Sequence, residues 1–168
     1  MPIIWQPAMS VGAKAIDDEH KYLFALVNCV ELALKTGEKA SISLFLDQLI
    51  DYCQEHFSHE EKLQLSIRYP YYAENKRQHI EILENLQELR QRIEASVEKL
   101  AVGAEIDDYT PEQGASTEPP EQIDIDAATI RDISELLRQW ILEHVLVIDR
   151  KMHPFLTRLG EGKLKQYL

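Results

Sequence analysis

The chain has few of the residues that would build a disulfide-stabilised, membrane-spanning or β-rich protein. Only two of its 168 residues are cysteines, Cys29 and Cys53. Both fall on segments with helical periodicity, so we expect reduced, mostly buried thiols. The sequence contains no long apolar run that could cross a membrane, no alternation typical of strands and no internal repeat. These absences favour an all-α fold.

An export signal and a basic surface are also missing. The opening residues, MPIIWQPAMS, contain neither a basic region nor an apolar signal core, so we expect a cytoplasmic protein. The formal net charge is −11 and the Lys and Arg residues are scattered, which argues against nucleic acid as a partner. A length of 168 residues with 45% hydrophobic residues predicts one domain over residues 1–168.

Much of the negative charge lies in one stretch, residues 105–126. This stretch has no Lys or Arg, and it contains Gly114, Pro111, Pro119 and Pro120 beside its carboxylates. Such a composition buries too little apolar surface to offset the entropy of ordering, so it predicts a flexible acidic insertion. A regulatory or docking element is the alternative interpretation.

Apolar residues spaced by three and four predict four helices, near residues 17–36, 41–66, 71–101 and 127–158. An extended N-terminal arm precedes them. Gly37 is expected to end the first helix and Ser41 to cap the second, and Pro70 can open the third. Short first and second connections and a long third one predict an up-down-up-down four-helix bundle.

Four histidines, one on each predicted helix, occupy positions where a packed helix normally carries leucine: His20, His56, His79 and His144. If neighbouring helices are antiparallel, all four lie at one end of the bundle. A single histidine on an apolar face is usually a buried residue with hydrogen-bonded nitrogens. Four at one level, with Glu60 one turn after His56, would each lose hydration without compensation unless a metal binds them.

The donor types indicate which metals fit. Imidazole and carboxylate without thiolate suit iron, manganese or zinc, and carboxylates near two histidine pairs suit two oxygen-bridged ions. Asp149 is the second carboxylate candidate, but five helical residues separate it from His144, which places the two about 140° apart on an ideal helix. It can join the site only through a π-like bulge, and an Asp149 exposed to solvent is the equal alternative.

Several stretches of the chain resemble the hemerythrins, specifically the bacterial single-domain type. They are IIWQPAMSVGAKAIDDEHKYLFALVN, HFSHEE, YP followed by QHIEIL, and WILEHVLVID. The resemblance covers nearly the whole length apart from the acidic insertion. It implies a non-heme diiron centre that binds O2 reversibly, with His20 and His56 on one iron, His79 and His144 on the other, and Glu60 and Asp149 bridging. It therefore favours Asp149 as a ligand.

One position departs from the family pattern. Hemerythrins usually carry another histidine four residues before the one matching His79, and this chain has Asn75 there. The place could be filled by the Asn75 amide oxygen, by water, or by Tyr72. The resemblance also implies an O2 pocket lined by Phe57, Trp140, Ile141 and Val145, although each could equally be a plain core residue. Met152 stands where the family often has an aromatic residue.

Two functions from different classes follow. The first is a carrier, store or sensor of O2 or of a related small molecule such as peroxide, and the resemblance favours it. The alternative is a diiron oxidase or peroxidase that uses the additional open place left by Asn75. A third interpretation is a regulatory site with one metal or a different metal. The protein partner, if any, is not indicated by the sequence.

Overall fold

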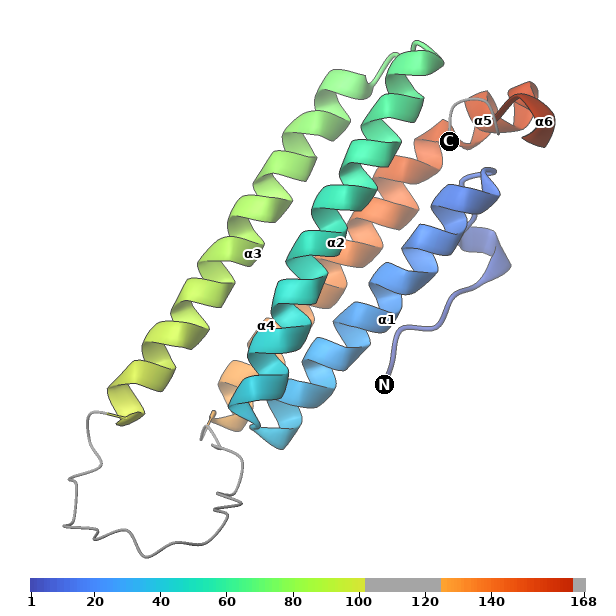
Figure 1. Cartoon of the computed structure of the whole chain (residues 1–168). Coiled ribbons are helices and arrows are strands. Elements are labelled where there is room, and N and C mark those ends of the chain that lie inside the picture. The colour runs from blue at the N-terminus through green and yellow to red at the C-terminus, as the bar shows by residue number, and fades with distance from the viewer. Residues whose placement is uncertain (102–124, 165–168) are drawn as a thin grey trace, which may run out of the picture.

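Four long helices form an antiparallel bundle in the computed structural model (Figure 1). The structure describes residues 1–101 and 125–164, without the side chains of residues 96–101, 161 and 163. Within these ranges there is no strand, and the predicted all-α, up-down-up-down bundle is confirmed. Its long helices are α1 (Lys14–Thr36), α2 (Lys39–Ser66), α3 (Tyr72–Ala101) and α4 (Ala127–Glu143). The predicted acidic insertion lies outside the described residues, except for its last two positions.

The helix ends follow local chemistry. Gly37 adopts a left-handed conformation with φ 71°, and its N–H donates to the Ala33 carbonyl at 3.0 Å, so the predicted end of α1 is confirmed. The prediction that Ser41 caps α2 is wrong, because α2 begins at Lys39 after Glu38. The Ser41 hydroxyl instead donates to the Glu38 carboxylate at 2.6 Å. Asp126 caps α4 by accepting from the backbone N–H groups of Ala128 and Thr129.

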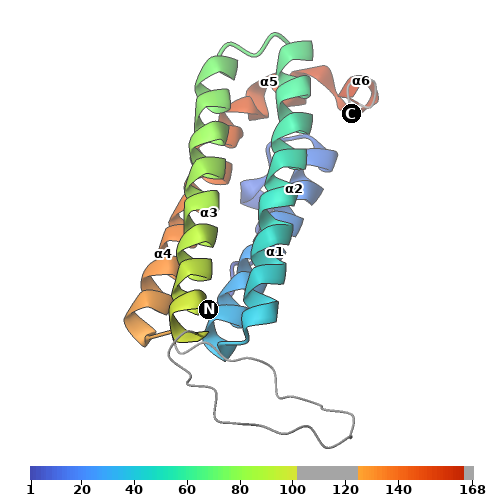
Figure 2. The ribbon, with the colours of Figure 1, turned by 60° about the vertical axis from the view of Figure 1, so that its left-hand side comes forward.

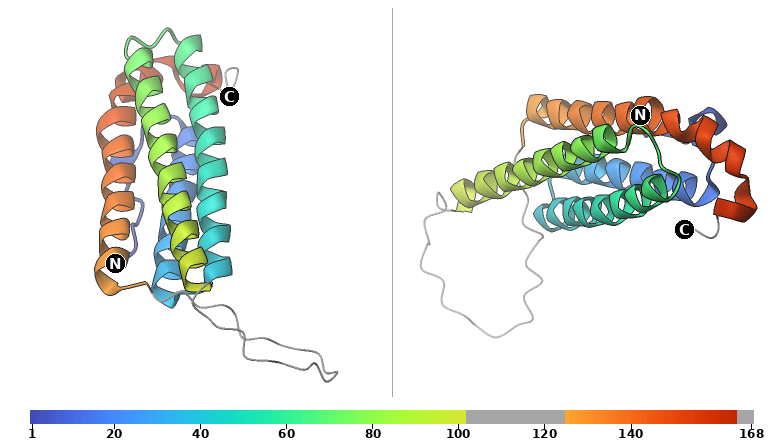
Figure 3. Two further views of the ribbon diagram at one scale, coloured as in Figure 1. Left: turned by 90° about the vertical axis from the view of Figure 1, so that its left-hand side faces the viewer. Right: turned by 90° about the horizontal axis from the view of Figure 1, so that it is seen from above.

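The fourth helical segment changes its winding, where the sequence predicted one helix over 127–158. After α4 come the π-helical η2 (His144–Ile148), the 3-10 turn η3 (Asp149–Met152), α5 (His153–Leu159) and α6 (Glu161–Leu164). The π-like turn that Asp149 would need in order to join the site is thus present. In Figure 3, α5 and α6 turn across the end of the bundle at which α1 begins.

The buried apolar residues form two clusters. The larger one fills the bundle from Leu23 and Phe57 to the far end. The smaller one, which includes Ile16, Leu63 and Met152, closes the near end. A layer of buried polar side chains lies between the two clusters. Along α1, His20 follows Ile16 of the smaller cluster and precedes Leu23 of the larger one. Along α2, Glu60 follows Phe57 of the larger cluster and precedes Leu63 of the smaller one. The two clusters therefore seal this polar layer from both ends.

The N-terminal arm runs beside α1 (Figure 1 and Figure 2). It contains one 3-10 turn, η1 (Pro7–Met9). The backbone N–H and C=O of Ile3 bond to the Asn28 side chain at 2.8 and 2.9 Å, and Trp5 packs over the rings of His20 and Phe24. The arm is thereby fixed to α1. None of the described helices combines the length and the apolar character needed to cross a membrane.

Candidate metal centre

Six of the residues predicted as metal ligands are fully or almost fully buried in the polar layer. Their side chains come from four helical segments, with exposures of 0 to 2%. α1 carries His20, α2 carries His56 and Glu60, α3 carries His79, and the last segment carries His144 and Asp149. The π turn η2 inserts an extra residue into its turn, which turns Asp149 toward the same interior as His144.

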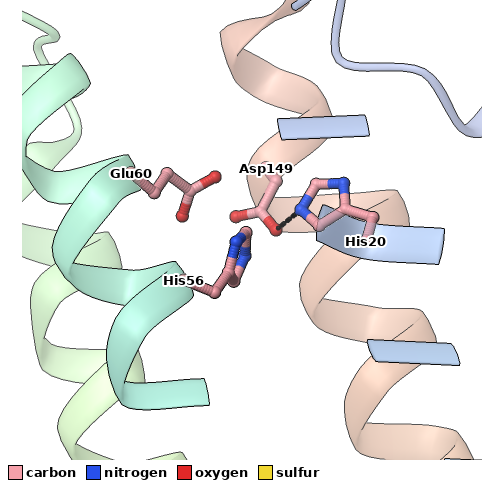
Figure 4. A group of neighbouring side chains, drawn as sticks. All are labelled: His20, His56, Glu60 and Asp149. Atoms are coloured by element: carbon pink, nitrogen blue, oxygen red, sulfur yellow. Dashed lines mark ion pairs between the residues drawn. The ribbon is translucent and has the colours of Figure 1, made fainter. Parts of the chain in front are cut away.

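The six side chains form two groups that share both carboxylates. One group is His20, His56, Glu60 and Asp149 (Figure 4), and the other is Glu60, His79, His144 and Asp149. Asp149 Oδ2 lies 3.3 Å from Nε2 of His20 and 3.2 Å from Nε2 of His144. Glu60 Oε2 lies 3.2 Å from Nε2 of His79. Two ligand atoms about 2.1 Å from one ion at roughly right angles are about 3 Å apart, so these separations fit shared ions.

Most of the nitrogen and oxygen atoms that could bind a metal in the two groups have no hydrogen-bond partner among the described residues. Burying such atoms without a hydrogen bond costs on the order of 1–3 kcal/mol each, and more where they are charged. A bound metal would supply the missing partner to each atom. The unpartnered atoms are both ring nitrogens of His20 and of His144, Nε2 of His56 and of His79, and the carboxylate oxygens of Glu60 and Asp149.

Two further carboxylates orient two of the histidines, and neither was predicted from the sequence. Glu19 accepts from Nδ1 of His56 at 2.8 Å, and Glu61 lies 3.0 Å from Nδ1 of His79. A carboxylate at Nδ1 keeps the proton there and leaves Nε2 free to bind a metal. Both residues are direct chain neighbours of ligand candidates, Glu19 of His20 and Glu61 of Glu60. That adjacency was the available signal.

Burial dominates the electrostatics of the site. It lowers the pKa of His20, His56 and His144, and it raises the pKa of Glu60 and Asp149, that of Asp149 to about 8. His79 is the exception: burial lowers its pKa, but the Glu60 and Glu61 carboxylates outweigh this effect and raise it. Burial thus disfavours the charged forms of Glu60 and Asp149, and a nearby cation would stabilise those charged forms.

Asn75 occupies the position where the family usually has a histidine. Its side chain is fully buried one turn before His79, and neither its amide oxygen nor its nitrogen has a partner among the described residues. Tyr72 is not brought to the two groups. It is only partly buried at the first residue of α3, and its hydroxyl lies 3.3 Å from the Lys76 ammonium, which donates to it.

Tyr69 and Gln64 are two buried polar residues that the sequence analysis did not single out. The Tyr69 hydroxyl and the Gln64 amide oxygen lack partners among the described residues, while the Gln64 nitrogen donates to the sulfur of Met152 at 3.4 Å. Burial raises the pKa of Tyr69, and the nearby Asp149 and Glu60 carboxylates add to this. A phenol thus stands near the carboxylates although Met152 replaces the family's usual aromatic residue.

The predicted pocket residues lie next to the second histidine pair, His79 and His144, either in space or along the chain. Phe57 stacks on His79 with ring centroids 4.0 Å apart and meets the His144 ring edge-on at 5.2 Å. Ile141 and Val145 are completely buried on either side of His144 along the chain. Trp140 is only partly buried and lines a surface pocket between α3 and α4. Three of the four residues are therefore packed in the core.

Fold and buried donors together define an antiparallel helical bundle with a candidate two-metal site near one end. Residues 11–156 match the hemerythrin HHE cation-binding domain family. The chain belongs to this family.

Individual relatives agree with this assignment. The chain is 29% identical over 93 residues to a bacteriohemerythrin of Stenotrophomonas maltophilia, a match that covers 55% of this chain and 61% of that protein. A bacteriohemerythrin of Methylococcus capsulatus is 24% identical over 84% of this chain and 86% of its own length. A myohemerythrin of Sipunculus nudus is 30% identical, with 53% of this chain and 69% of that protein covered. A wild-type hemerythrin crystal structure superposes with a TM-score of 0.67 at 23% identity, covering 94% of this chain and 99% of the other.

Proposed function

We propose that this chain holds two iron ions in the polar layer and binds O2 reversibly, as a carrier, store or sensor. The observation that carries the proposal is the pair of buried donor groups, which share two carboxylates and leave their donor atoms unpartnered. The relatives named as bacteriohemerythrin and myohemerythrin support iron and O2 over manganese or zinc. Ferrous ions in such a site would supply electrons to O2 and a coordination place for it.

Each ligand candidate has a distinct role in this proposal. His20 and His56 would hold one ion, His79 and His144 the other, and Glu60 and Asp149 would bridge the two. Glu19 and Glu61 keep the Nδ1 protons in place and so direct Nε2 of His56 and His79 inward. The apolar side chains of Phe57, Ile141 and Val145 exclude water around the second pair.

Asn75 would complete the second pair. Its buried, unpartnered amide oxygen lies one turn before His79 on the same helix face, so it either ligates directly or holds a water ligand. Both forms are weaker than an imidazole ligand. The oxidase or peroxidase alternative depends on this position, but the named relatives do not favour it. The cytoplasmic location and the absence of nucleic acid partners stay predictions.

Anaerobic loading with ferrous iron tests the proposal. We expect about two irons per chain and a visible absorption that appears under O2 and disappears under argon over repeated cycles. Asp149→Ala, which removes a shared carboxylate, should abolish the reversible signal. One metal per chain would contradict the dinuclear site. Immediate conversion to the ferric form with peroxide turnover would instead support the enzyme alternative.

A further inference from the structure

A surface pocket of about 170 Å³ opens between α3 and the segment formed by α4 and η2. Its α3 wall includes Gln78, Glu81 and Asn85, and the opposite wall includes Trp140 and Glu143. His144, which is 2% exposed, is also part of its lining. The pocket therefore extends from solvent to His144, a candidate metal ligand, and its volume is ample for O2 or a few water molecules.

The same seam holds a second, smaller cavity. It measures about 50 Å³, shares Ile82, Asn85 and Trp140 with the first pocket, and is otherwise lined by leucines. Helix α3 makes few close backbone contacts with α4 among the described residues, whereas α1 packs closely on α2 and on α4. The α3–α4 seam is thus the loosest side of the bundle near the second histidine pair.

The mouth of the larger pocket carries negative charge only. Glu81 and Glu143 are both exposed, and within the described part of the chain neither has an ion-pair partner. The other polar groups at the mouth are the neutral amides of Gln78 and Asn85, and the lining includes no Lys or Arg. Two unpaired carboxylates at the pocket opening repel small anions, but they leave an uncharged diatomic molecule unaffected.

We propose that this pocket is the route by which small uncharged ligands reach the second histidine pair, and that Glu81 and Glu143 keep small anions out. The inference rests on the proposed function for the identity of the physiological ligand. The route itself follows from the pocket, its contact with His144 and the charge at its mouth. Trp140 lies in its wall, with an indole N–H that has no acceptor among the described residues, and it can report on what enters.

Fluorescence quenching tests the route without O2 binding. The chain has two tryptophans, so Trp5→Phe leaves Trp140 as its single fluorescent tryptophan. The full chain is loaded with zinc, because zinc does not quench tryptophan fluorescence. We expect acrylamide, a neutral quencher, to quench Trp140 and iodide to do so only weakly. Changing Glu81 and Glu143 to Gln should raise the iodide quenching constant about threefold and leave the acrylamide constant unchanged.

A matched control separates local from overall charge. Glu84 on α3 and Glu135 on α4 are exposed, lie outside the pocket lining and, changed to Gln, alter the net charge equally. This control should leave iodide quenching unchanged. Equal iodide constants for E81Q/E143Q and the parent would overturn the proposal, as would an equal rise in the control.

Ligand kinetics of the iron-loaded chain give the second test. E81Q/E143Q should speed azide association about fivefold without changing the O2 association rate. Asn85→Phe, which fills the mouth, should slow both ligands. Unchanged rates in Asn85→Phe would show that ligands enter elsewhere. If the parent takes up no O2, the proposed function fails, while azide kinetics and quenching still decide the route.

Discussion

The two buried histidine pairs differ in their surroundings. His20 and His56 lie under the N-terminal arm, where Trp5 packs over the His20 ring. His79 and His144 lie against the stacked ring of Phe57, and a pocket to the surface includes His144 in its lining. The first pair is closed by its own chain. The second pair is the side on which a ligand can approach.

The pairs also differ in their additional donor atoms. Asn75 is buried one turn before His79, so a weak neutral oxygen is available to the second pair. The pKa of His79 is raised by its two carboxylate neighbours, whereas the pKa values of the other three histidines are lowered by burial. The two proposed metal positions therefore differ in their donor atoms and in the electrostatics of their histidines.

The largest expected effect comes from removing a carboxylate that both pairs share. Glu60→Ala should reduce bound iron from about two ions per chain to one or none, because both groups lose a donor atom. Metal analysis by mass spectrometry measures this. Glu55→Ala, five residues earlier on α2 and exposed, is the control and should retain both ions. Two ions retained in Glu60→Ala would exclude Glu60 as a bridge.

The orienting carboxylates allow the pairs to be weakened separately. Glu61→Gln should weaken metal binding at the second pair, and Glu19→Gln at the first, each by about 10- to 100-fold. Competition with a chelator gives the two affinities. Glu88→Gln, exposed on α3, serves as the control. The comparison fails if both variants weaken the same ion.

Asn75→His should make the second pair a three-histidine site. We expect the ferrous protein to autoxidise several-fold more slowly in air and any peroxidase activity to fall, because a stronger ligand leaves less room for water or anions. Stopped-flow and conventional absorbance traces follow the ferric product. Asn75→Ala should autoxidise faster than the parent. No change in either variant would mean that the Asn75 side chain contributes nothing to the site.

The smallest effect concerns the stability of the metal-free chain. The pKa of Asp149 rises from its ordinary value of 3.8 to about 8 on folding, so the folded chain keeps a proton that the unfolded chain has lost. Stability from this group is fully present below its unfolded pKa and is lost as the pH rises through about 8.

The urea midpoint of the metal-free chain should therefore fall by about 0.5–1 M between pH 7 and pH 9. Asp149→Asn cannot ionise and should show a flatter profile over the same range. Metal binding should also flatten it, since the ion compensates the carboxylate charge. An equal slope in the parent and in Asp149→Asn would assign the pH dependence to other groups.

Periodicity was sufficient to predict the bundle and the burial of the four histidines. A helix that carries His20 or His79 on an apolar stripe must turn that residue inward, whatever its neighbours are. Whether Asp149 joins the site could be stated only as a condition, because His144 and Asp149 are five residues apart. On an ideal helix, two residues at that spacing point in different directions. The π turn at His144–Ile148 satisfied that condition. Ser41 failed as a cap because α2 begins two residues earlier, at Lys39.

The sequence by itself determined the helical bundle, the buried donor types and their placement at one level, since these depend on helical spacing and hydrophobicity. Only the tertiary structure decided which atoms meet. The contacts of Glu19 with His56 and of Glu61 with His79, and the seam beside His144, all depend on how neighbouring helices are rotated and separated. Rotation and separation are set by side-chain packing across helices, and local sequence does not specify them.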